Sequence, residues 1–205
     1  ATGFAPATAW SASFGDADGW APAAYGATLA LGDLDGDGRA DLCGRGPSGL
    51  VCALSEGAGF GAVTPWLYPA FTDAEGWGAR SRFLSLRLGD INGDGLADVC
   101  GRTATGILCA RSDGARFRDL HYPVNASFLD LQGWDDESRG ATLLLARLDG
   151  SGAAHLCGRD ASGLVCHRAA PDPDRDGIAS ALDNCPHTWN PDQQDSNGDG
   201  TGDAC

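Results

Sequence analysis

The sequence predicts an all-β fold in which three propeller-like, four-stranded blades precede a small, irregular, calcium-wrapped C-terminal segment. The blades are predicted by an internal repeat, because Cys43, Cys100 and Cys157 follow one another at intervals of 57 residues. The C-terminal segment is predicted by a change in composition toward aspartate. We expect the repeats to occupy residues 1–169 and the acidic segment to occupy residues 170–205.

Other residue types keep the same period. They are a second set of cysteines (Cys52, Cys109, Cys166), a set of tryptophans (Trp20, Trp77, Trp134) and a set of phenylalanines (Phe14, Phe71, Phe128). A period shared by independent markers indicates repeated structural units.

Each unit is expected to contain four short strands separated by glycine turns. The first strand is expected at 28–31, 84–88 and 142–145, and the second, which ends in Gly-Arg, at 42–45, 99–102 and 156–159. The third follows a tight turn, as at 49–52, and the fourth runs from near Phe60 toward Trp66 and from near Phe117 toward Tyr122.

The two ends of the repeat region are offset from each other. The chain opens with a fourth-type strand at 3–10, and its last unit stops after a third-type strand at 163–166. Three blades are fewer than the usual count of about 4–8. Either the ring closes in an unusual way, or further blades lie outside this chain, or another molecule supplies the missing strand, since an unpaired edge is a template for strand addition.

Composition favours an extracellular protein that carries cations. The net charge of −14 disfavours nucleic acid as a partner, and no apolar run is long enough to cross a membrane. Eight cysteines, an even number, suggest an oxidising compartment. The chain contains no methionine, so we expect that its initiator and a signal peptide have been removed. A secreted or cell-surface location follows.

Two aspartate-rich loops are expected to bind calcium. Loop 1 (residues 33–41) and loop 2 (residues 90–98) place side-chain oxygens at positions 1, 3, 5 and 9 and a glycine at position 6, where the chain must turn sharply. The expected ligands are Asp33, Asp35, Asp37 and Asp41 with the carbonyl of Arg39, and Asp90, Asn92, Asp94 and Asp98 with the carbonyl of Leu96. The alternative is a pair of solvated Asp-Gly turns.

Loop 3 (residues 147–155) departs from this pattern. Arg147, Ser151 and His155 replace three of the four expected ligands, so we predict no calcium there. We expect the guanidinium of Arg147 to bond Asp149 or nearby carbonyls in place of the ion.

The loops and their strand setting resemble the FG-GAP or VCBS repeat family, over roughly residues 1–169. The resemblance implies propeller blades with calcium in a blade hairpin, and roles in adhesion or carbohydrate binding. The family is found in integrin heads and in many secreted bacterial proteins.

Six cysteines are expected to form three short-range disulfides. Folding each Cys-x8-Cys segment symmetrically places its two cysteines opposite each other across a hairpin, as for Cys43 with Cys52. The other pairs are Cys100 with Cys109 and Cys157 with Cys166. A zinc site is the weaker alternative, because no Cys-x-x-Cys pattern is present.

The acidic segment resembles a thrombospondin type 3 repeat over residues 172–205. The resemblance implies one calcium ion held by Asp172, Asp174, Asp176 and Asp183 with the carbonyl of Ile178, and another held by Asp195, Asn197, Asp199 and Asp203 with the carbonyl of Thr201. It also implies a disulfide between Cys185 and Cys205. With one ion in each of loops 1 and 2, the chain would carry four calcium ions.

The repeated Phe-x-Asp-x-x-Gly-Trp motif has two interpretations. Trp20, Trp77 and Trp134 could stack on sugar rings, or they could be packing elements between units, which their recurrence in every unit favours. No catalytic motif is present, so we expect that the chain is not an enzyme. Asn125 begins a glycosylation sequon.

We expect an extracellular calcium-binding structural or adhesion module, which polymerises head to tail into a fibre by strand complementation. The alternatives are a carbohydrate-binding lectin and an accessory domain of a larger secreted protein. The expected partners are other copies of the chain or extracellular proteins and glycans.

Overall fold

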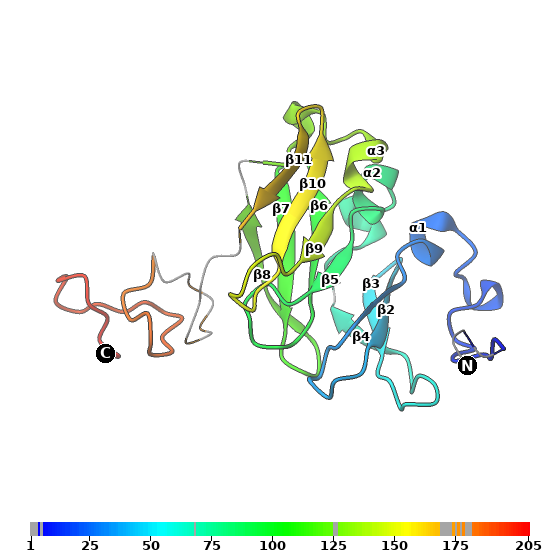
Figure 1. Ribbon diagram of the computed structural model, residues 1–205, viewed down its shortest axis with the longest axis horizontal. Helices are drawn as coiled ribbons and strands as arrows, with labels where there is room; N and C mark the ends of the chain where they lie inside the picture. The colour runs from blue at the N-terminus through cyan, green and yellow to red at the C-terminus, as the bar shows by residue number, and fades with distance from the viewer. Residues whose placement is uncertain are drawn as a thin grey trace.

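The computed structural model describes residues 4, 6–67, 69–124, 127–168, 174, 176, 178 and 182–205 (Figure 1). Three open antiparallel sheets dominate it, and no closed sheet is found among these residues. Unit 1 contains β1 (Ala30–Gly32), β2 (Asp41–Gly46), β3 (Gly49–Ala53) and β4 (Thr64–Leu67); unit 2 contains β5 (Arg87–Gly89), β6 (Asp98–Thr103), β7 (Gly106–Ser112) and β8 (Phe117–Val124); unit 3 contains β9 (Leu144–Ala146), β10 (His155–Asp160) and β11 (Gly163–His167). The all-β prediction is confirmed, and unit 3 forms a three-stranded sheet within the described residues.

Short helical turns precede each sheet. They are α1 (Ala23–Gly26), α2 (Arg80–Phe83) and α3 (Glu137–Gly140), each preceded by a 3-10 turn at Asp16–Asp18, Asp73–Glu75 or Asp130–Gln132. The α turns follow one another along one side of the sheets, with α2 in contact with both α1 and α3 (Figure 1). None of the helices in the described part of the chain has the length and apolarity needed to span a bilayer.

The first strands begin later than predicted, because a hydroxyl residue ends each helical turn. Thr28 donates its hydroxyl hydrogen to the carbonyl of Tyr25 at 2.6 Å, and its oxygen accepts from the backbone N–H of Arg45 at 2.8 Å. Ser85 and Thr142 make the same two contacts in units 2 and 3. These side-chain bonds hold the chain in a turn, so that β1 starts at Ala30 rather than Thr28.

The predicted fourth strands are only partly correct. β8 begins at Phe117 as predicted, whereas β4 begins at Thr64 and Phe60 forms only an isolated bridge with Ser55. The strand predicted at 3–10 is absent at residues 4 and 6–10. Instead, the carbonyl of Trp10 accepts a hydrogen bond from the backbone N–H of Phe60 at 2.9 Å.

The core lies between neighbouring units. Trp66 of unit 1 packs edge-on against Phe117 of unit 2, with ring centroids 5.4 Å apart. β5 contacts both β1 and β9, so the first strands of the three units lie next to one another. The same backbone bond closes both junctions: Ala97 N–H donates to the carbonyl of Asp33, and Ala154 N–H to that of Asp90, both at 2.6 Å.

All four predicted disulfides are present. Cys43–Cys52, Cys100–Cys109 and Cys157–Cys166 join directly opposite residues of a hairpin, with Cα atoms 4.0–4.1 Å apart. The hairpin turns in unit 1 at Pro47-Ser48, as the symmetrical folding predicts. Cys185–Cys205 closes the C-terminal segment.

Candidate functional site

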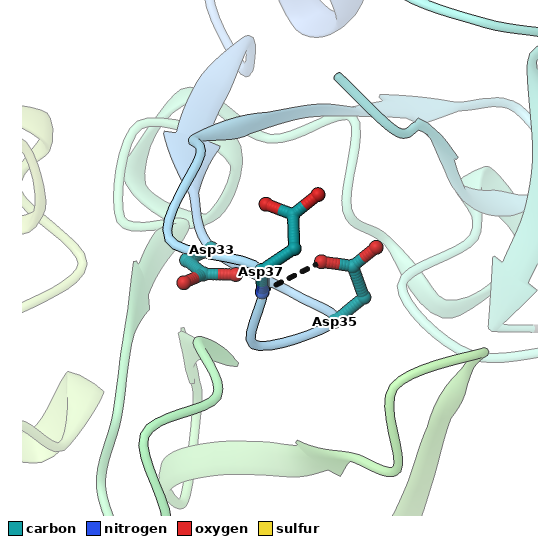
Figure 2. A group of neighbouring side chains, drawn as sticks. All are labelled: Asp33, Asp35 and Asp37. Atoms are coloured by element: carbon teal, nitrogen blue, oxygen red, sulfur yellow. Dashed lines mark hydrogen bonds between the residues drawn. The ribbon is translucent and has the colours of Figure 1, made fainter. Parts of the chain in front are cut away.

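Loop 1 curls around its first aspartate (Figure 2). The carboxylate of Asp33 accepts backbone N–H bonds from Gly36 at 2.8 Å and from Gly38 at 2.9 Å. Both glycines have left-handed φ angles, +82° and +83°, which residues with a side chain rarely adopt. Asp35 and Asp37 accept the backbone N–H bonds of the residues two positions further on.

This curl brings three carboxylates to one place. Asp33, Asp35 and Asp37 each offer an oxygen, and these oxygens lie within 4.8 Å of one another. Such a group can hold a divalent cation, because calcium binds oxygen ligands at about 2.3–2.6 Å. The guanidinium of Arg39 forms an ion pair with Asp37, so part of the negative charge is already balanced.

The same hydrogen bonds build loop 2 and a loop in the C-terminal segment, which we call the tail loop (residues 195–203). Asp90 accepts from the backbone of Gly93 and Gly95, and Asp195 accepts from the backbone of Gly198 and Gly200. The side chains at positions 3 and 5 (Asn92 and Asp94, Asn197 and Asp199) accept backbone bonds as their counterparts in loop 1 do. Loops from the repeats and from the acidic C-terminal segment thus share one local structure.

The acid at position 9 makes contacts of its own, and its role as a calcium ligand stays a prediction. Asp41 is fully buried and accepts backbone N–H bonds from Leu34 at 2.8 Å and Ser55 at 2.7 Å, and it does not join the cluster around Asp33. Asp98 accepts equivalent bonds from Ile91 and Ser112. Each of these two carboxylates therefore connects the start of its loop to the chain at the end of the third strand.

Burial raises the pKa of both carboxyl groups. The pKa of Asp41 is raised, and that of Asp98 is raised to about 7, because desolvation outweighs the two backbone bonds that favour the charged form. In the tail loop, Asp203 also accepts the backbone N–H at position 2, from Ser196. Its exposed position lets the Ser196 bonds lower the pKa of Asp203 instead.

Loop 3 lacks the cluster, but Arg147 does not replace the ion in the way predicted. Its guanidinium lies 2.8 Å from a carboxylate oxygen of Asp90 in loop 2 rather than beside Asp149. Asp149 instead pairs with Arg168 at 2.7 Å and with His155 at 3.3 Å. Arg147 therefore links loop 3 to loop 2, because it is long enough to cross the junction between units.

A second acidic cluster lies in the C-terminal segment. Asp174, Asp176 and Asp183 offer oxygens within 4.8 Å of one another. Asp176 and Asp183 are only 2% and 8% exposed, and one buried oxygen each of Asp174 and Asp183 has no hydrogen-bond partner. Buried, unpartnered carboxylate oxygens are costly without a compensating cation. Asp172 lies outside the described residues, and Ile178 donates its backbone N–H to Asp176.

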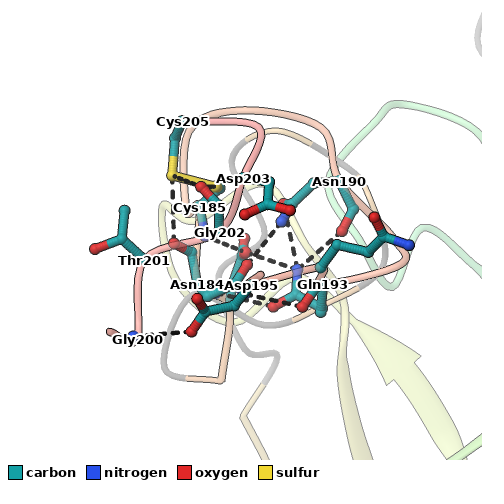
Figure 3. Close-up of a disulfide and its surroundings, with 12 residues drawn as sticks. Asn184, Cys185, Asn190, Gln193, Asp195, Gly200, Thr201, Gly202, Asp203 and Cys205 are labelled. Atoms are coloured by element: carbon teal, nitrogen blue, oxygen red, sulfur yellow. Dashed lines mark hydrogen bonds between the residues drawn. A yellow bond between two sulfur atoms is a disulfide. The ribbon is translucent and has the colours of Figure 1, made fainter. Parts of the chain in front are cut away.

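Two amide residues that the sequence does not single out complete this segment (Figure 3). Gln193 donates to Asp183 at 2.9 Å, and its own carbonyl oxygens accept from the backbone and side chain of Asn184, next to the Cys185–Cys205 disulfide. Asn190 donates its backbone N–H to Asp176 at 3.1 Å. The disulfide and this amide network hold a segment that has little apolar core.

The recurring tryptophans are packing elements. Trp77 and Trp134 are 2% and 3% exposed, so they are unavailable to a sugar. A Cβ on Gly101 would stand 2.6 Å from the ring of Trp77, and Gly44 and Gly158 stand equally close to Trp20 and Trp134. The glycine of each Gly-Arg pair therefore makes room for the indole. The burial of Trp77 and Trp134 agrees with the packing interpretation that their recurrence favours, and Trp20 is only partly exposed.

The arginines of the Gly-Arg pairs in units 1 and 2 join neighbouring units, a role that the motif alone does not reveal. Arg45 and Arg102 are 0% and 1% exposed, and each forms an ion pair with an aspartate of the next unit, Asp73 or Asp130. The arginine and the aspartate each recur after 57 residues, and in both pairs the arginine precedes the aspartate by 28 residues. This constant spacing is the sequence signal that links the two residues.

A polar cleft of about 230 Å³ lies where the C-terminal segment meets unit 2. Trp189, 66% exposed, stands at this cleft together with Asn92 and Asp94 of loop 2. Four charged residues also line it: Arg111, Asp113, Arg118 and Asp119. An exposed indole among charged and amide groups offers both an apolar face and hydrogen-bonding partners.

Residues 33–100 match the FG-GAP-like repeat family. The match begins at the first residue of loop 1 and ends within the second strand of unit 2, so it confirms the FG-GAP part of the resemblance there. The resemblance of the C-terminal segment to thrombospondin type 3 repeats stays a prediction, as does the division of the chain at residue 169. No curated protein sequence matches the chain.

Among solved structures, a lectin from Agrocybe aegerita is 28% identical and matches 69% of this chain with a TM-score of 0.57. It is described as specifically recognising non-reducing terminal N-acetylglucosamine. The match covers 34% of the lectin, so this chain spans about a third of its length. A TcdB2-TccC3 structure matches 67% of this chain and 6% of its own at 18% identity, with a TM-score of 0.47, too distant for a functional comparison.

Proposed function

We propose that this chain is an extracellular, calcium-binding adhesion module that recognises glycans. The observation that carries the proposal is the likeness to the Agrocybe aegerita lectin, together with the FG-GAP-like repeat. Four disulfides support an extracellular location, because such bonds persist in oxidising compartments. We expect a binding activity and no catalysis.

The cleft at Trp189 is the glycan site that the residues support best. Sugars are recognised by an aromatic face that covers their C–H groups and by polar groups that bond their hydroxyls, and Trp189 and Asp94 offer one of each. The cleft joins the repeats to the C-terminal segment, so both parts of the chain contribute to it. By analogy with the lectin, a terminal N-acetylhexosamine is the first ligand class to test.

Calcium has a structural role in this proposal. Ions at Asp33 and Asp90 in the repeats, and at Asp183 and Asp195 in the C-terminal segment, would neutralise part of the charge of −14. The buried oxygen of Asp183 that lacks a partner supports an ion in its cluster. An ion in loop 2 would also fix Asn92 and Asp94 at the edge of the cleft.

A propeller-like arrangement of the units is the architecture that this function implies. The bonds from Ala97 to Asp33 and from Ala154 to Asp90 repeat with the same length of 2.6 Å. Identical junctions between successive units favour a constant rotation from one unit to the next, as blades around an axis require.

A glycan array tests the proposed site. We expect binding to glycans that end in N-acetylglucosamine, and at least about tenfold weaker binding by Trp189→Ala. The loss of a nucleic-acid base stacked on an aromatic ring costs about 1–3 kcal/mol, and we expect a comparable cost for a sugar face stacked on Trp189. Leu131→Ala is the control, because Leu131 is an apolar residue that is 97% exposed and lies outside the cleft. Equal glycan binding by both variants would show that the glycan site lies elsewhere on the chain. No binding to any glycan would refute the lectin-like function.

A further inference from the structure

Each junction between units is closed by a buried arginine. A guanidinium nitrogen of Arg45 in unit 1 lies 2.7 Å from a carboxylate oxygen of Asp73, at the start of unit 2. Arg102 of unit 2 pairs with Asp130 of unit 3 in the same way. A backbone bond accompanies each pair, since the N–H of Asp73 donates to the carbonyl of Pro47 and the N–H of Asp130 to that of Ala104.

Unit 3 and the 3-10 turn before unit 1 each hold one half of this junction, without the other half among the described residues. Arg159 of unit 3 stands where Arg45 and Arg102 stand in their units, but it is exposed and its side chain has no ion pair within the described residues. Asp16 stands 57 residues before Asp73 in an equivalent 3-10 turn. It too is exposed, and its carboxylate has no ion pair in the part of the chain that the structure describes.

The apolar residues around Arg159 are uncovered as well. Leu50 and Ile107 are 3% and 0% exposed in units 1 and 2, whereas their counterpart Leu164 is 66% exposed. The difference arises because β11 is an edge strand, with no fourth strand beside it among the described residues. The outer face of unit 3 thus has the composition of a junction, but no neighbouring unit covers it in the part of the chain that the structure describes.

Unit 1 presents the complementary open face. A groove of about 780 Å³ is lined by Trp10, Leu29, Leu31, Ala40, Leu42 and Phe60. In unit 2 the residues equivalent to Leu29, Ala40, Leu42 and Phe60 are Leu86, Ala97, Val99 and Phe117, which are 2–7% exposed and packed in one cluster with unit 1. The groove is therefore the face that a preceding unit covers at the other junctions.

The N-terminal segment shows which kind of unit belongs there. Trp10 packs on Phe60 with ring centroids 5.9 Å apart, as Trp66 of β4 packs on Phe117 at 5.4 Å. The residues around Trp10 thus occupy the place of the fourth strand of a preceding unit. Unit 3 has the other three strands, and no fourth strand lies beside them among the described residues. The segment around Trp10 and the outer face of unit 3 are therefore complementary.

We propose that unit 3 of one copy docks on unit 1 of a second copy of this chain. Arg159 of one copy pairs with Asp16 of the other, Leu164 is covered by the segment that contains Trp10, and the groove of unit 1 is filled. Within one chain the two faces do not meet, because α1 and the β10–β11 hairpin lie on different sides of the molecule (Figure 1). Two copies can satisfy each other in a closed ring, and an unclosed rotation gives a filament through the same interface.

Charge reversal tests this pairing by sedimentation equilibrium at increasing protein concentration. We expect the wild-type chain to self-associate, and Arg159→Asp and Asp16→Arg each to weaken association at least tenfold by placing like charges together. An equimolar mixture of the two variants should regain wild-type association, because every junction between the two variants joins opposite charges. Only a head-to-tail contact between these residues predicts such rescue.

Two outcomes would overturn the proposal: a wild-type chain that stays monomeric at concentrations of hundreds of micromolar, or single variants that associate as the wild type does. Misfolding is checked separately by thermal unfolding in dilute solution, where both variants should melt as the wild type does because both sites are exposed. The assay uses no glycan, so its result is independent of the proposed lectin-like function.

Discussion

Arg45 and Asp73 form an ion pair across the junction of two units, with a nitrogen–oxygen distance of 2.7 Å. The arginine side chain is fully buried, its guanidinium also donates to the carbonyl of Ala24, and it lies over the ring of Tyr25. The hydroxyl of Tyr25 donates to Asp73 at 2.6 Å, and this bond, followed by the bond from Arg45, lowers the pKa of Asp73. One arginine thus binds both its own unit and the next.

Removing this arginine should weaken the junction. We expect Arg45→Met to lower the free energy of unfolding by about 2–4 kcal/mol, because it strands buried carbonyls and leaves Asp73 without its cation. Chemical denaturation of the monomeric chain measures the change. Arg116→Met is the matched control, since Arg116 is exposed and should change stability by less than about 0.5 kcal/mol. Equal effects of both variants would contradict the role of the buried pair.

The tryptophan pocket gives a second prediction. We expect Gly101→Ala to destabilise the chain by about 1–3 kcal/mol, because the added methyl group would stand 2.6 Å from the Trp77 ring. Gly150→Ala provides the control, as a Cβ there meets no atom within 4 Å. Thermal unfolding of the two variants should separate them clearly. If Gly101→Ala melts like the wild type, the indole does not pack in the way that the structure shows.

Asp98 should make the stability of the calcium-free chain depend on pH. Its folded-state pKa of about 7 exceeds the unfolded value of about 3.9, so the folded state holds a proton that the unfolded state has lost. The resulting stabilisation is complete below about pH 4 and disappears as the pH rises through about 7. From Asp98 alone, the free energy of unfolding should be about 2 kcal/mol larger at pH 5.5 than at pH 8.

The variant Asp98→Asn isolates this contribution, because its amide does not titrate. Denaturation at several pH values in the presence of chelator should show the slope between pH 5.5 and pH 8 reduced in Asp98→Asn and kept in Asp35→Asn, whose carboxylate is only partly buried. The same slope in both variants would show that Asp98 is ionised throughout this range.

Metal removal should loosen the C-terminal segment first. Asp174, Asp176 and Asp183 lie close together, and without a cation their charges repel one another. We expect chelator to speed proteolysis after residue 174 by at least tenfold, while the repeats, which have an apolar core, stay intact. Asp183→Ala should show fast cleavage even in calcium. Cleavage at one rate with and without calcium would indicate that the segment needs no ion.

Much of the fold was predictable because the period of 57 residues and the cysteine hairpins are local or repeated signals. The strand boundaries were less so: Thr28 lies in an apolar run, but its hydroxyl bonds Tyr25 and Arg45 instead of extending the strand. The curl of loop 1 could be predicted from the spacing of its aspartates. The burial and contacts of Asp41 could not, because its partner Ser55 comes from a different part of the hairpin.

The contacts between units were the hardest to foresee. Arg45 and Asp73 each belong to a motif that is visible in the sequence, yet only the three-dimensional arrangement brings the two motifs together. Arg147 shows the same difficulty, because it contacts Asp90 of the preceding unit and not its own loop. The cleft at Trp189 depends on how the C-terminal segment meets unit 2, which no local pattern encodes.

We propose that calcium-filled loops hold this chain in the shape that binds a glycan. The most direct test is surface plasmon resonance of one immobilised sample on a glycan that ends in N-acetylglucosamine, measured in calcium, then in chelator, then after calcium is restored. We predict that binding is present, is lost in chelator and returns with calcium. Binding that persists unchanged in chelator, by a chain shown to be free of metal, would contradict the account.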